Sequence, residues 1–246
     1  MDERTTYEVL LVGGSPSPSE ARLMASLARS AAAIVAVDRG LDWCLRADVV
    51  PTLFCGDADT VSPSALRQAR DAGVRGDLHP REKDETDLEL AFRLAQELAA
   101  GHELRVTLSC VSGGRPDHGL AVFGVLARHA DCWPRMVEDG FECRVLSPQG
   151  RTSWELADDA CGQVFSSIAL APDSELSLEG FAWDYERTTL GLLDDRGVSN
   201  VVRAPHARVS CLAGCVAAFL FDDGSASADA DARPPISAVP ATDKSS

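Results

Sequence analysis

The chain has 246 residues, of which 45% are hydrophobic and 25% charged. This composition is typical of soluble globular proteins and excludes disorder of the whole chain. Its 23 basic and 38 acidic side chains give a net charge of −15, which repels nucleic acid and anionic membranes and attracts cationic substrates. A ligand that carries phosphate would therefore need a metal ion or locally placed basic groups. The length predicts one large domain or two small ones.

The sequence has no segment with the features of a membrane span or a signal peptide. Its longest apolar stretches, residues 31–37 and 212–221, are shorter than the roughly 18 residues that a spanning helix requires. The charged start Met1-Asp2-Glu3-Arg4 does not resemble a signal peptide. We therefore expect a cytoplasmic protein that binds neither membrane nor nucleic acid.

Eight cysteines are scattered along the chain without a Cys-x-x-Cys pair. The spacing between Cys211 and Cys215 is not that of a zinc knuckle. Because several cysteines lie within apolar runs, we expect buried, reduced thiols rather than disulfides or zinc ligands.

In the first half of the sequence, short apolar runs alternate with amphipathic segments. Strands are expected at residues 7–12, 34–37, 53–55 and 104–111. Helices are expected at about residues 18–32, 41–47, 63–73, 86–100 and 115–130. Repeated βα units of this kind predict a doubly wound, mostly parallel sheet with helices on both faces.

Two of these helices have the sequence of a capping box at their start. Ser17 is the expected cap of the first helix, with Glu20 completing the box. Thr86 and Glu89 stand in the same relation at residues 86–100.

The second half has a different period. Short strands, separated by Gly, Pro and Asp turn signals, are expected at residues 135–137, 143–147, 163–171, 175–178, 209–212 and 215–221. This pattern predicts a smaller, antiparallel β-sandwich. We therefore expect an α/β catalytic domain at residues 1–132, a β-sandwich domain at 133–222 and a disordered tail at 223–246, where large apolar side chains are scarce.

Acidic residues collect where the strands of the first half are expected to end. They are Asp38, Asp57, Asp59, Asp84, Asp87 and Asp117. Ligands of doubly wound sheets bind outside the carboxyl ends of the strands. Carboxylates that converge there repel one another, and a divalent cation relieves that repulsion. Because the ligand set contains only oxygen, it favours Mg²⁺ over zinc.

The segment Ser112-Gly113-Gly114-Arg115-Pro116-Asp117-His118 lies between an expected strand and an expected helix. Its two glycines allow the backbone to approach a phosphate, and the helix N-terminus adds N–H groups and a positive dipole. A guanidinium such as that of Arg115 matches phosphate geometry. Together with the carboxylates, the segment predicts a phosphoryl-transfer site. The chain has neither a P-loop nor a GxGxxG dinucleotide motif.

Each of these features also has a purely structural interpretation. Asp57 and Asp59 are residue types that are common in turns. Thr86 is explained by helix capping alone, and Asp117 by the dipole at the start of its helix. From the residues alone, a metal–phosphate site and a set of ordinary turns remain open, and no substrate is named.

Five motifs occur in a fixed order. They are Asp38-Arg39-Gly40, Gly56-Asp57-Ala58-Asp59-Thr60, Asp84-Glu85-Thr86-Asp87-Leu88-Glu89-Leu90-Ala91, Gly113-Gly114-Arg115-Pro116-Asp117-His118 and Ser199-Asn200. In order and spacing, over about residues 9–222, the sequence resembles the thiamine pyrophosphokinase (thiamine diphosphokinase) family. Each motif alone is a weak signal, and the five together are specific.

The resemblance implies an α/β catalytic domain, a C-terminal β-sandwich and a homodimer with sites at the subunit interface. It also implies transfer of a diphosphate group from ATP to the hydroxyl of thiamine, giving thiamine diphosphate and AMP. The thiamine oxygen would attack the β-phosphorus of MgATP in line. The cationic thiazolium ring suits an acidic site.

The resemblance also implies roles for individual residues. The residues expected to act in catalysis and to hold Mg²⁺ are Asp57, Asp59, Asp87 and Asp117. Those expected to bind the nucleotide are Asp38, Thr86, Gly113, Gly114, Arg115 and His118. Ser199 and Asn200 would contact the substrate from the second domain, and either Asp87 or Asp117 would accept the hydroxyl proton.

The sequence departs from the family pattern at several positions. Arg39 stands where the family has glycine, and it either contacts phosphate or points to solvent. Asp42 stands where a polar residue such as Asn is common, and Val198 where a second Ser is frequent. Trp183 and Tyr185 would either stack on a ligand ring or pack in the core.

Two other functions fit part of the pattern. One is transfer of diphosphate to another hydroxymethyl heterocycle, such as a pterin, but the β-rich second half argues against it. The other is non-catalytic binding of a nucleotide or thiamine diphosphate, against which the set of four carboxylates argues.

Overall fold

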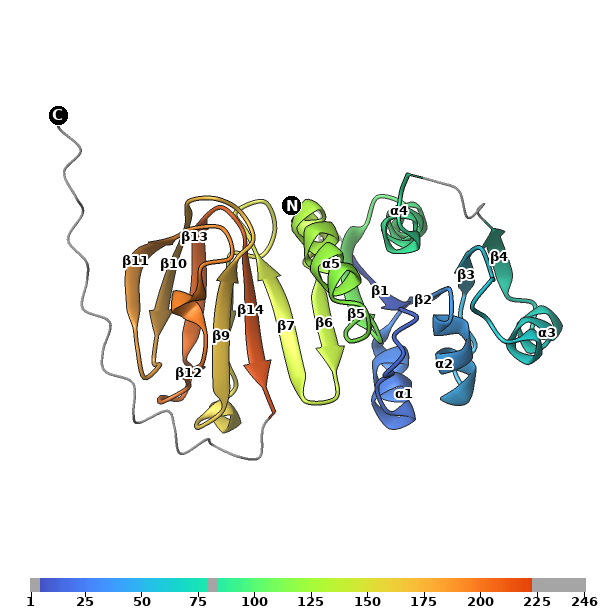
Figure 1. Ribbon diagram of the computed structural model, residues 1–246, viewed down its shortest axis with the longest axis horizontal. Helices are drawn as coiled ribbons and strands as arrows, with labels where there is room; N and C mark the ends of the chain where they lie inside the picture. Colours follow the sequence, from blue (N-terminus) through green and yellow to red (C-terminus); the bar gives the residue numbers. More distant parts are fainter. Residues whose placement is uncertain (1–4, 79–83, 223–246) are drawn as a thin grey trace.

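Fourteen strands form two sheets, of ten and four strands, in residues 5–78 and 84–222, which are the residues that the computed structural model describes (Figure 1). The tail expected at 223–246 lies outside the described residues. No helix in the described part is long and apolar enough to cross a membrane.

One end of the ten-stranded sheet is parallel, with the strand order β6-β5-β1-β2-β3-β4. These strands are β1 (Thr6–Val12), β2 (Ala33–Val37), β3 (Leu53–Gly56), β4 (Arg75–Leu78), β5 (Glu103–Ser109) and β6 (Arg135–Glu138). The expected doubly wound, mostly parallel sheet is thereby confirmed. The sequence did not predict β4, because three of its four residues are Arg, Gly and Asp.

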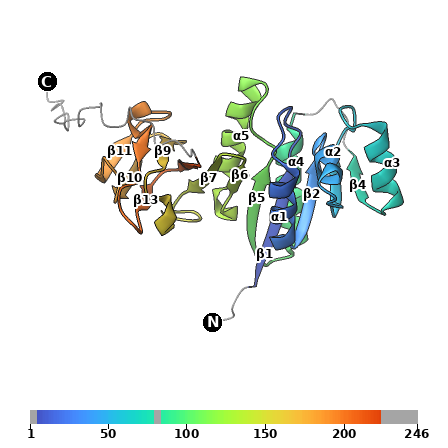
Figure 2. The same cartoon turned by 90° about the horizontal axis from the view of Figure 1, so that it is seen from below.

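Five helices cover the two faces of this parallel region (Figures 1 and 2). They are α1 (Ala21–Ser30), α2 (Gly40–Arg46), α3 (Pro63–Asp71), α4 (Asp87–Ala99) and α5 (Pro116–Arg128). Successive side chains of a strand point to opposite faces. In β1, Val9 and Leu11 accordingly pack in the core with α4 and α5, whereas Leu10 and Val12 pack in the core with α1, α2 and α3.

The first helix begins later than expected. Helix α1 starts at Ala21, and its N-cap residue Glu20 makes no side-chain cap. The N–H of Ser17 instead donates to Ser15 Oγ (3.1 Å), and the N–H of Glu20 donates to Asp139 Oδ2 (2.6 Å). The predicted capping box of Ser17 and Glu20 is therefore wrong, because residues 15–20 form a loop that other contacts hold.

The start of α4 agrees with the sequence, apart from one contact. Thr86 Oγ1 accepts from the N–H of Glu89 (3.3 Å), so this cap is confirmed. The Glu89 carboxylate is engaged elsewhere, with Arg128 (2.5 Å) and His129 (2.7 Å) at the end of α5. It therefore ties α4 to α5.

The antiparallel strands form a sandwich. Four of them continue the ten-stranded sheet beyond β6: β7 (Phe141–Leu146), β14 (Val216–Phe221), β9 (Val164–Ala169) and β12 (Asn200–Val201). The second sheet contains β8 (Ser153–Glu155), β13 (Arg208–Ala213), β10 (Ser174–Glu179) and β11 (Tyr185–Leu190). Phe165 and Leu176, one from each sheet, are fully buried in the core between them.

The expected antiparallel sandwich is confirmed as part of the fold, and it shares a sheet with the parallel half. Strand β6 pairs in parallel with β5 and antiparallel with β7. The division into domains at residues 132 and 133 therefore stays a prediction. The strands β8, β11 and β12 were not predicted because they are short or rich in polar residues.

All eight cysteines are free, and all except Cys161 are buried. Burial raises the pKa of the Cys110 thiol to about 11 and that of Cys211 to about 12, which keeps both protonated at neutral pH.

Candidate functional site

Two predicted site residues meet at the carboxyl ends of β2 and β3. Asp38 follows β2 directly and has a left-handed backbone (φ 49°). A Cβ atom at Gly56, the last residue of β3, would lie 2.0 Å from Asp38 Oδ1. The Asp38 carboxylate therefore lies directly against the backbone that leads into Asp57, and only glycine leaves room for it there.

Asp57 and Asp59 form the turn after β3. The N–H of Asp59 donates to Asp57 Oδ1 (3.0 Å), and Ala58 between them has a left-handed backbone (φ 65°). Asp59 is exposed and Asp57 half-buried. The turn presents two carboxylates to solvent beside Asp38.

The start of α4 lies next to this turn. The Cys55 thiol in β3 donates to the carbonyl oxygen of Asp87 (3.8 Å). Thr86, the cap of α4, is exposed, as is Asp84. The structure thus brings Asp38, Asp57 and Asp87 to adjacent chain segments, as the βα pattern predicted.

The glycine-rich segment forms the loop between β5 and α5. Gly113 and Gly114 both have left-handed backbones (φ 84° and 79°). A Cβ at Gly114 would lie 2.9 Å from Pro16. The loop that follows β1 therefore leaves no room for a side chain at this position. Ser15, in that loop, donates through its N–H to Cys110 O (2.9 Å).

The loop after β1 connects the glycine-rich loop to the acidic turns. On one side, Ser15 Oγ donates to the carbonyl of Ser112. On the other side, a Cβ at Gly14 would lie 3.2 Å from the Cβ of Arg39. Because Arg39 follows Asp38, these contacts form a continuous line along the carboxyl edge of β5, β1, β2 and β3. The structure places Arg39 beside this loop.

Asp42, which also differs from the family pattern near this edge, makes a contact that stabilises the fold. Its Oδ2 accepts from the N–H of Ser62 (3.1 Å), the cap of α3. The side chain at this position therefore ties α2 to the start of α3.

Arg115 and Asp117 form an ion pair at the start of α5. Arg115 Nη2 lies 2.5 Å from Asp117 Oδ2, and the side chains are 72% and 62% exposed. Hydrogen bonds from Arg115 lower the pKa of Asp117 to about 2. Asp117 Oδ1 also accepts from the N–H of His118 (3.0 Å), so Asp117 is ionised and held at the helix start.

One residue that sequence reasoning missed anchors this edge. Glu138, at the end of β6, is buried, and its carboxylate accepts five hydrogen bonds. Three come from consecutive backbone N–H groups at 2.9, 2.9 and 3.1 Å, and two from serine hydroxyls at 2.5 and 3.5 Å: Cys110, Val111, Ser112, Ser19 and Ser109. It therefore fixes both the β5–α5 and the β1–α1 loop. The signal in the sequence was a lone Glu in a short apolar strand.

The site residues predicted in the second half of the sequence lie in the antiparallel sandwich, away from the carboxyl edge of the parallel strands. Asn200 is buried, and its side-chain amide bonds the backbone of Trp183 in both directions (3.1 and 2.8 Å). Ser199 is exposed and has a left-handed backbone (φ 61°). Tyr185 packs against the sandwich core and donates to Arg196 O (2.6 Å). Ser199 is therefore accessible, whereas Asn200 positions Trp183.

The carboxyl edge of β5, β1, β2 and β3, with Asp38, Asp57, Asp59 and Asp87, is called the acidic edge. Within one chain it lies far from the residues around Ser199. In the order of the ten-stranded sheet, β12 is first and β3 ninth (Figure 1). At about 4.8 Å per strand this corresponds to roughly 38 Å along the sheet. One chain alone does not bring Ser199 or Asn200 to the other predicted residues.

The four predicted metal ligands are not clustered tightly. Among the described residues, the one group whose ligand atoms lie within 4.8 Å of one another is His129, Asp131 and Cys132. Mg²⁺ is commonly held by one or two carboxylates, with waters and substrate phosphates completing the octahedron. The carboxylate oxygens of half-buried Asp57 and exposed Asp59 suit such a site.

The contact between Arg115 and Asp117 predicts how the pKa of the Asp117 carboxyl changes when the arginine is removed. Replacing Arg115 by Ala should raise the pKa of Asp117 from about 2 toward the ordinary Asp value of about 3.9. The carboxyl carbon shift of Asp117 in an NMR pH titration measures this change. Arg93→Ala, which removes another exposed arginine, should leave the Asp117 titration unchanged. A pKa near 4 in the unaltered protein would contradict the pairing.

The Glu138 contacts predict that a neutral isostere is destabilising. Glu138→Gln places an NH₂ group against backbone N–H donors, so it should lower the free energy of unfolding by about 2 kcal/mol. It should also speed hydrogen exchange at the N–H groups of residues 110–112. The matched control is Asp139→Asn, because Asp139 is exposed and the new amide oxygen still accepts from Glu20. Equal stability of both variants would show that the Glu138 contacts are not an anchor.

Comparison with known proteins relates this geometry to a family. The thiamin pyrophosphokinase catalytic-domain model matches residues 24–134. The thiamine pyrophosphokinase of Bacillus subtilis is 25% identical over 173 residues, which are 68% of this chain and 76% of that protein.

Solved structures share the fold. The crystal structure of thiamine pyrophosphokinase from B. subtilis covers 89% of this chain and 100% of its own, with TM-score 0.73 and 21% identity. That from Geobacillus thermodenitrificans covers the same shares, with TM-score 0.72 and 23% identity. Thiamin pyrophosphokinase from Candida albicans covers 88% of this chain and 89% of its own, with TM-score 0.68 and 14% identity. The catalytic-domain match and the sequence relative both support a place for the chain in the thiamine pyrophosphokinase family.

Proposed function

We propose that the chain is a thiamine diphosphokinase, which transfers a diphosphate group from ATP to the hydroxyl of thiamine and releases AMP. One observation carries the proposal. The Gly113–Gly114 loop, the Asp38 turn and the Asp57 turn are joined by contacts along a single sheet edge. The names of the relatives support the same reaction.

The loop before α5 is suited to bind the phosphates of ATP. Its left-handed glycines expose backbone N–H groups at the N-terminus of a 13-residue helix, where the helix dipole favours anions. Arg115 is exposed and would exchange its contact with Asp117 for a phosphate oxygen. Asp38, Thr86 and His118 complete the proposed nucleotide site.

The carboxylates would hold the metal and handle the proton. Mg²⁺ bound by Asp57, Asp59, Asp87 and Asp117 would neutralise charge on the transferred group. While Arg115 holds Asp117, the low pKa of about 2 makes Asp117 a poor proton acceptor. A general base works best with a pKa near the working pH. Once Arg115 moves to a phosphate oxygen this effect on Asp117 is lost, so either Asp87 or Asp117 would accept the thiamine hydroxyl proton.

The position of Ser199 supports a homodimer. Within one chain it lies at the far edge of the ten-stranded sheet from β3, so it would meet the Asp57 turn only across two chains. We therefore propose that each site combines the α/β half of one copy with the sandwich of the other. Ser199, exposed on its turn, would contact thiamine, and Asn200 would support it through Trp183.

The reaction is tested by incubating the protein with thiamine, ATP and MgCl₂. We expect thiamine diphosphate and AMP to form in equimolar amounts, and phosphorus NMR measures both products. Asp87→Asn should lower kcat by about 10²-fold or more, because it removes a proposed metal ligand and base. Glu97→Gln, an exposed change on the same helix, should keep the wild-type rate.

Other outcomes of this assay would contradict the proposal. ATP binding without product from thiamine, but with product from a hydroxymethyl pterin, would support the alternative acceptor. Binding of MgATP that Asp87→Asn weakens only slightly, with no product from any acceptor, would indicate a binding protein.

A mixing experiment tests the shared site. Asp87→Asn and Ser199→Arg should each be inactive, the second because a cation would repel the thiazolium ring. Because random exchange of subunits leaves one intact site in each mixed dimer, an equal mixture should recover about a quarter of wild-type activity per chain. An inactive mixture in which native mass spectrometry detects mixed dimers would show that both residues act within one chain.

A further inference from the structure

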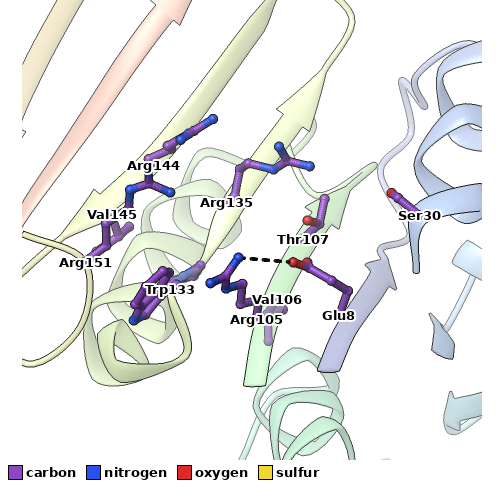
Figure 3. Close-up of a pocket in the computed structure, with 11 residues that line it drawn as sticks. Glu8, Ser30, Arg105, Val106, Thr107, Trp133, Arg135, Arg144, Val145 and Arg151 are labelled. Atoms are coloured by element: carbon purple, nitrogen blue, oxygen red, sulfur yellow. Dashed lines mark ion pairs between the residues drawn. The ribbon is translucent and has the colours of Figure 1, made fainter. Parts of the chain in front are cut away.

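A cavity lies at the opposite end of the parallel strands from the acidic edge. It encloses about 370 Å³, within the usual range of small-molecule sites. Arg105 near the start of β5, Arg135 at the start of β6 and Arg144 in β7 line it, together with Arg151 and Trp133 (Figure 3). We call it the arginine pocket. Four guanidinium groups thus gather in a chain of net charge −15.

Strand register places two of these arginines on one face. Arg135 and Arg144 are direct cross-strand partners in the β6–β7 pair, so their side chains share a face of the sheet. Their neighbours Met136 and Cys143 are likewise partners and pack on the other face, in the core with α5. Like charges directly opposite one another destabilise a sheet. The pairing therefore costs stability unless negative charge neutralises the two guanidinium groups.

Carboxylates neutralise the cluster only in part. Glu142 lies 2.6 Å from Arg144 Nε and 3.9 Å from Arg135 Nη1. Arg105 pairs with Glu103 (3.2 Å) and with Glu8 (3.8 Å), and Glu8 also lines the pocket.

Of the four pocket arginines, Arg151 is the one that forms no ion pair with a carboxylate in the described part of the chain. Among the described residues, no ion pair within 4.0 Å involves it, and its Nε donates to a carbonyl, Ser153 O (2.8 Å). Burial and the neighbouring guanidiniums of Arg144 and Arg105 lower the pKa of Arg151. The pocket therefore holds an excess of positive charge around Arg151.

The arginines are also held in place. The Arg105 guanidinium lies 4.5 Å from the centre of the Trp133 ring, and that of Arg151 lies 5.9 Å from it. Arg144 lies over Trp154 (4.5 Å). Stacking of this kind reduces the rotamer freedom that a bound ligand would otherwise have to remove. The cationic lining is thus partly ordered before any ligand binds.

We propose that the arginine pocket binds a small anion bearing a diphosphate group, at a site separate from the acidic edge. Guanidinium pairs match phosphate oxygens in charge and geometry. A diphosphate bridges several of the four arginines at once and relieves their mutual repulsion. The proposal does not depend on the proposed kinase activity, since no residue of the pocket belongs to the catalytic edge.

Calorimetric titration of the full chain with inorganic diphosphate, in EDTA and low salt, tests the proposal. Arg151→Gln and Arg135→Gln should each weaken binding about tenfold or more. Arg208→Gln, on the second sheet, should leave binding unchanged, and Arg115→Gln, at the acidic edge, reports whether diphosphate binds at the proposed ATP site instead. Titration with ADP in the same variants distinguishes a preference for free diphosphate from one for a diphosphate ester. If Arg151→Gln weakens the binding of either ligand, the arginine pocket is supported as the binding site.

Thermal unfolding provides a second measurement that guards against misfolded variants. Because Arg135→Gln removes a like-charge pair, it should keep or raise Tm in buffer while losing the rise in Tm that diphosphate gives the wild type. Absence of binding, or binding lost only in Arg115→Gln, would overturn the proposal. So would unchanged binding in arginine variants that turn a dimer into monomers, since the pocket would then be a contact between copies of the chain.

Discussion

The buried carboxylate of Glu138 is the contact on which the acidic edge depends. It collects three consecutive backbone N–H groups and two hydroxyls from the ends of β5 and β1. Buried N–H groups without an acceptor would lower stability, so the hydrogen bonds to Glu138 stabilise the observed conformation of both loops. The next residue, Asp139, holds the start of α1. One short hairpin strand, β6, therefore sets two loops of the proposed phosphate site.

That dependence also explains why the sandwich and the parallel half share a sheet. Strand β6 pairs with β5 on one side and β7 on the other. Its last residue, Glu138, binds the start of the glycine-rich loop, whereas its first, Arg135, lines the arginine pocket. A displacement of β6 would therefore move both residues. Strand β6 therefore connects the two halves by its strand pairing and positions Glu138 and Arg135.

The sequence predicted the acidic edge because that edge follows from a general rule. Residues after parallel strands meet at one edge, so Asp38 and Asp57 could be placed from the βα pattern alone. Glu138 could not, since its role depends on loops about 30 and 120 residues away in the chain. The prediction for the start of α1 was wrong for the same reason, because the N–H of Glu20 donates to Asp139 and not to Ser17. Strand β4 lacked any apolar signal.

Charge is segregated along the strands. The carboxyl ends carry aspartates at neighbouring turns, and the amino ends of β5 and β6 carry the arginines of the pocket. If the acidic edge binds ATP as we propose, it would need a metal before it could accept the phosphates, whereas the proposed site in the arginine pocket would not. A diphosphate group free of metal would then be drawn to the arginines, and one complexed with Mg²⁺ to the aspartates. On these two proposals, the two ends of one sheet would discriminate between two ionic forms of the same chemical group.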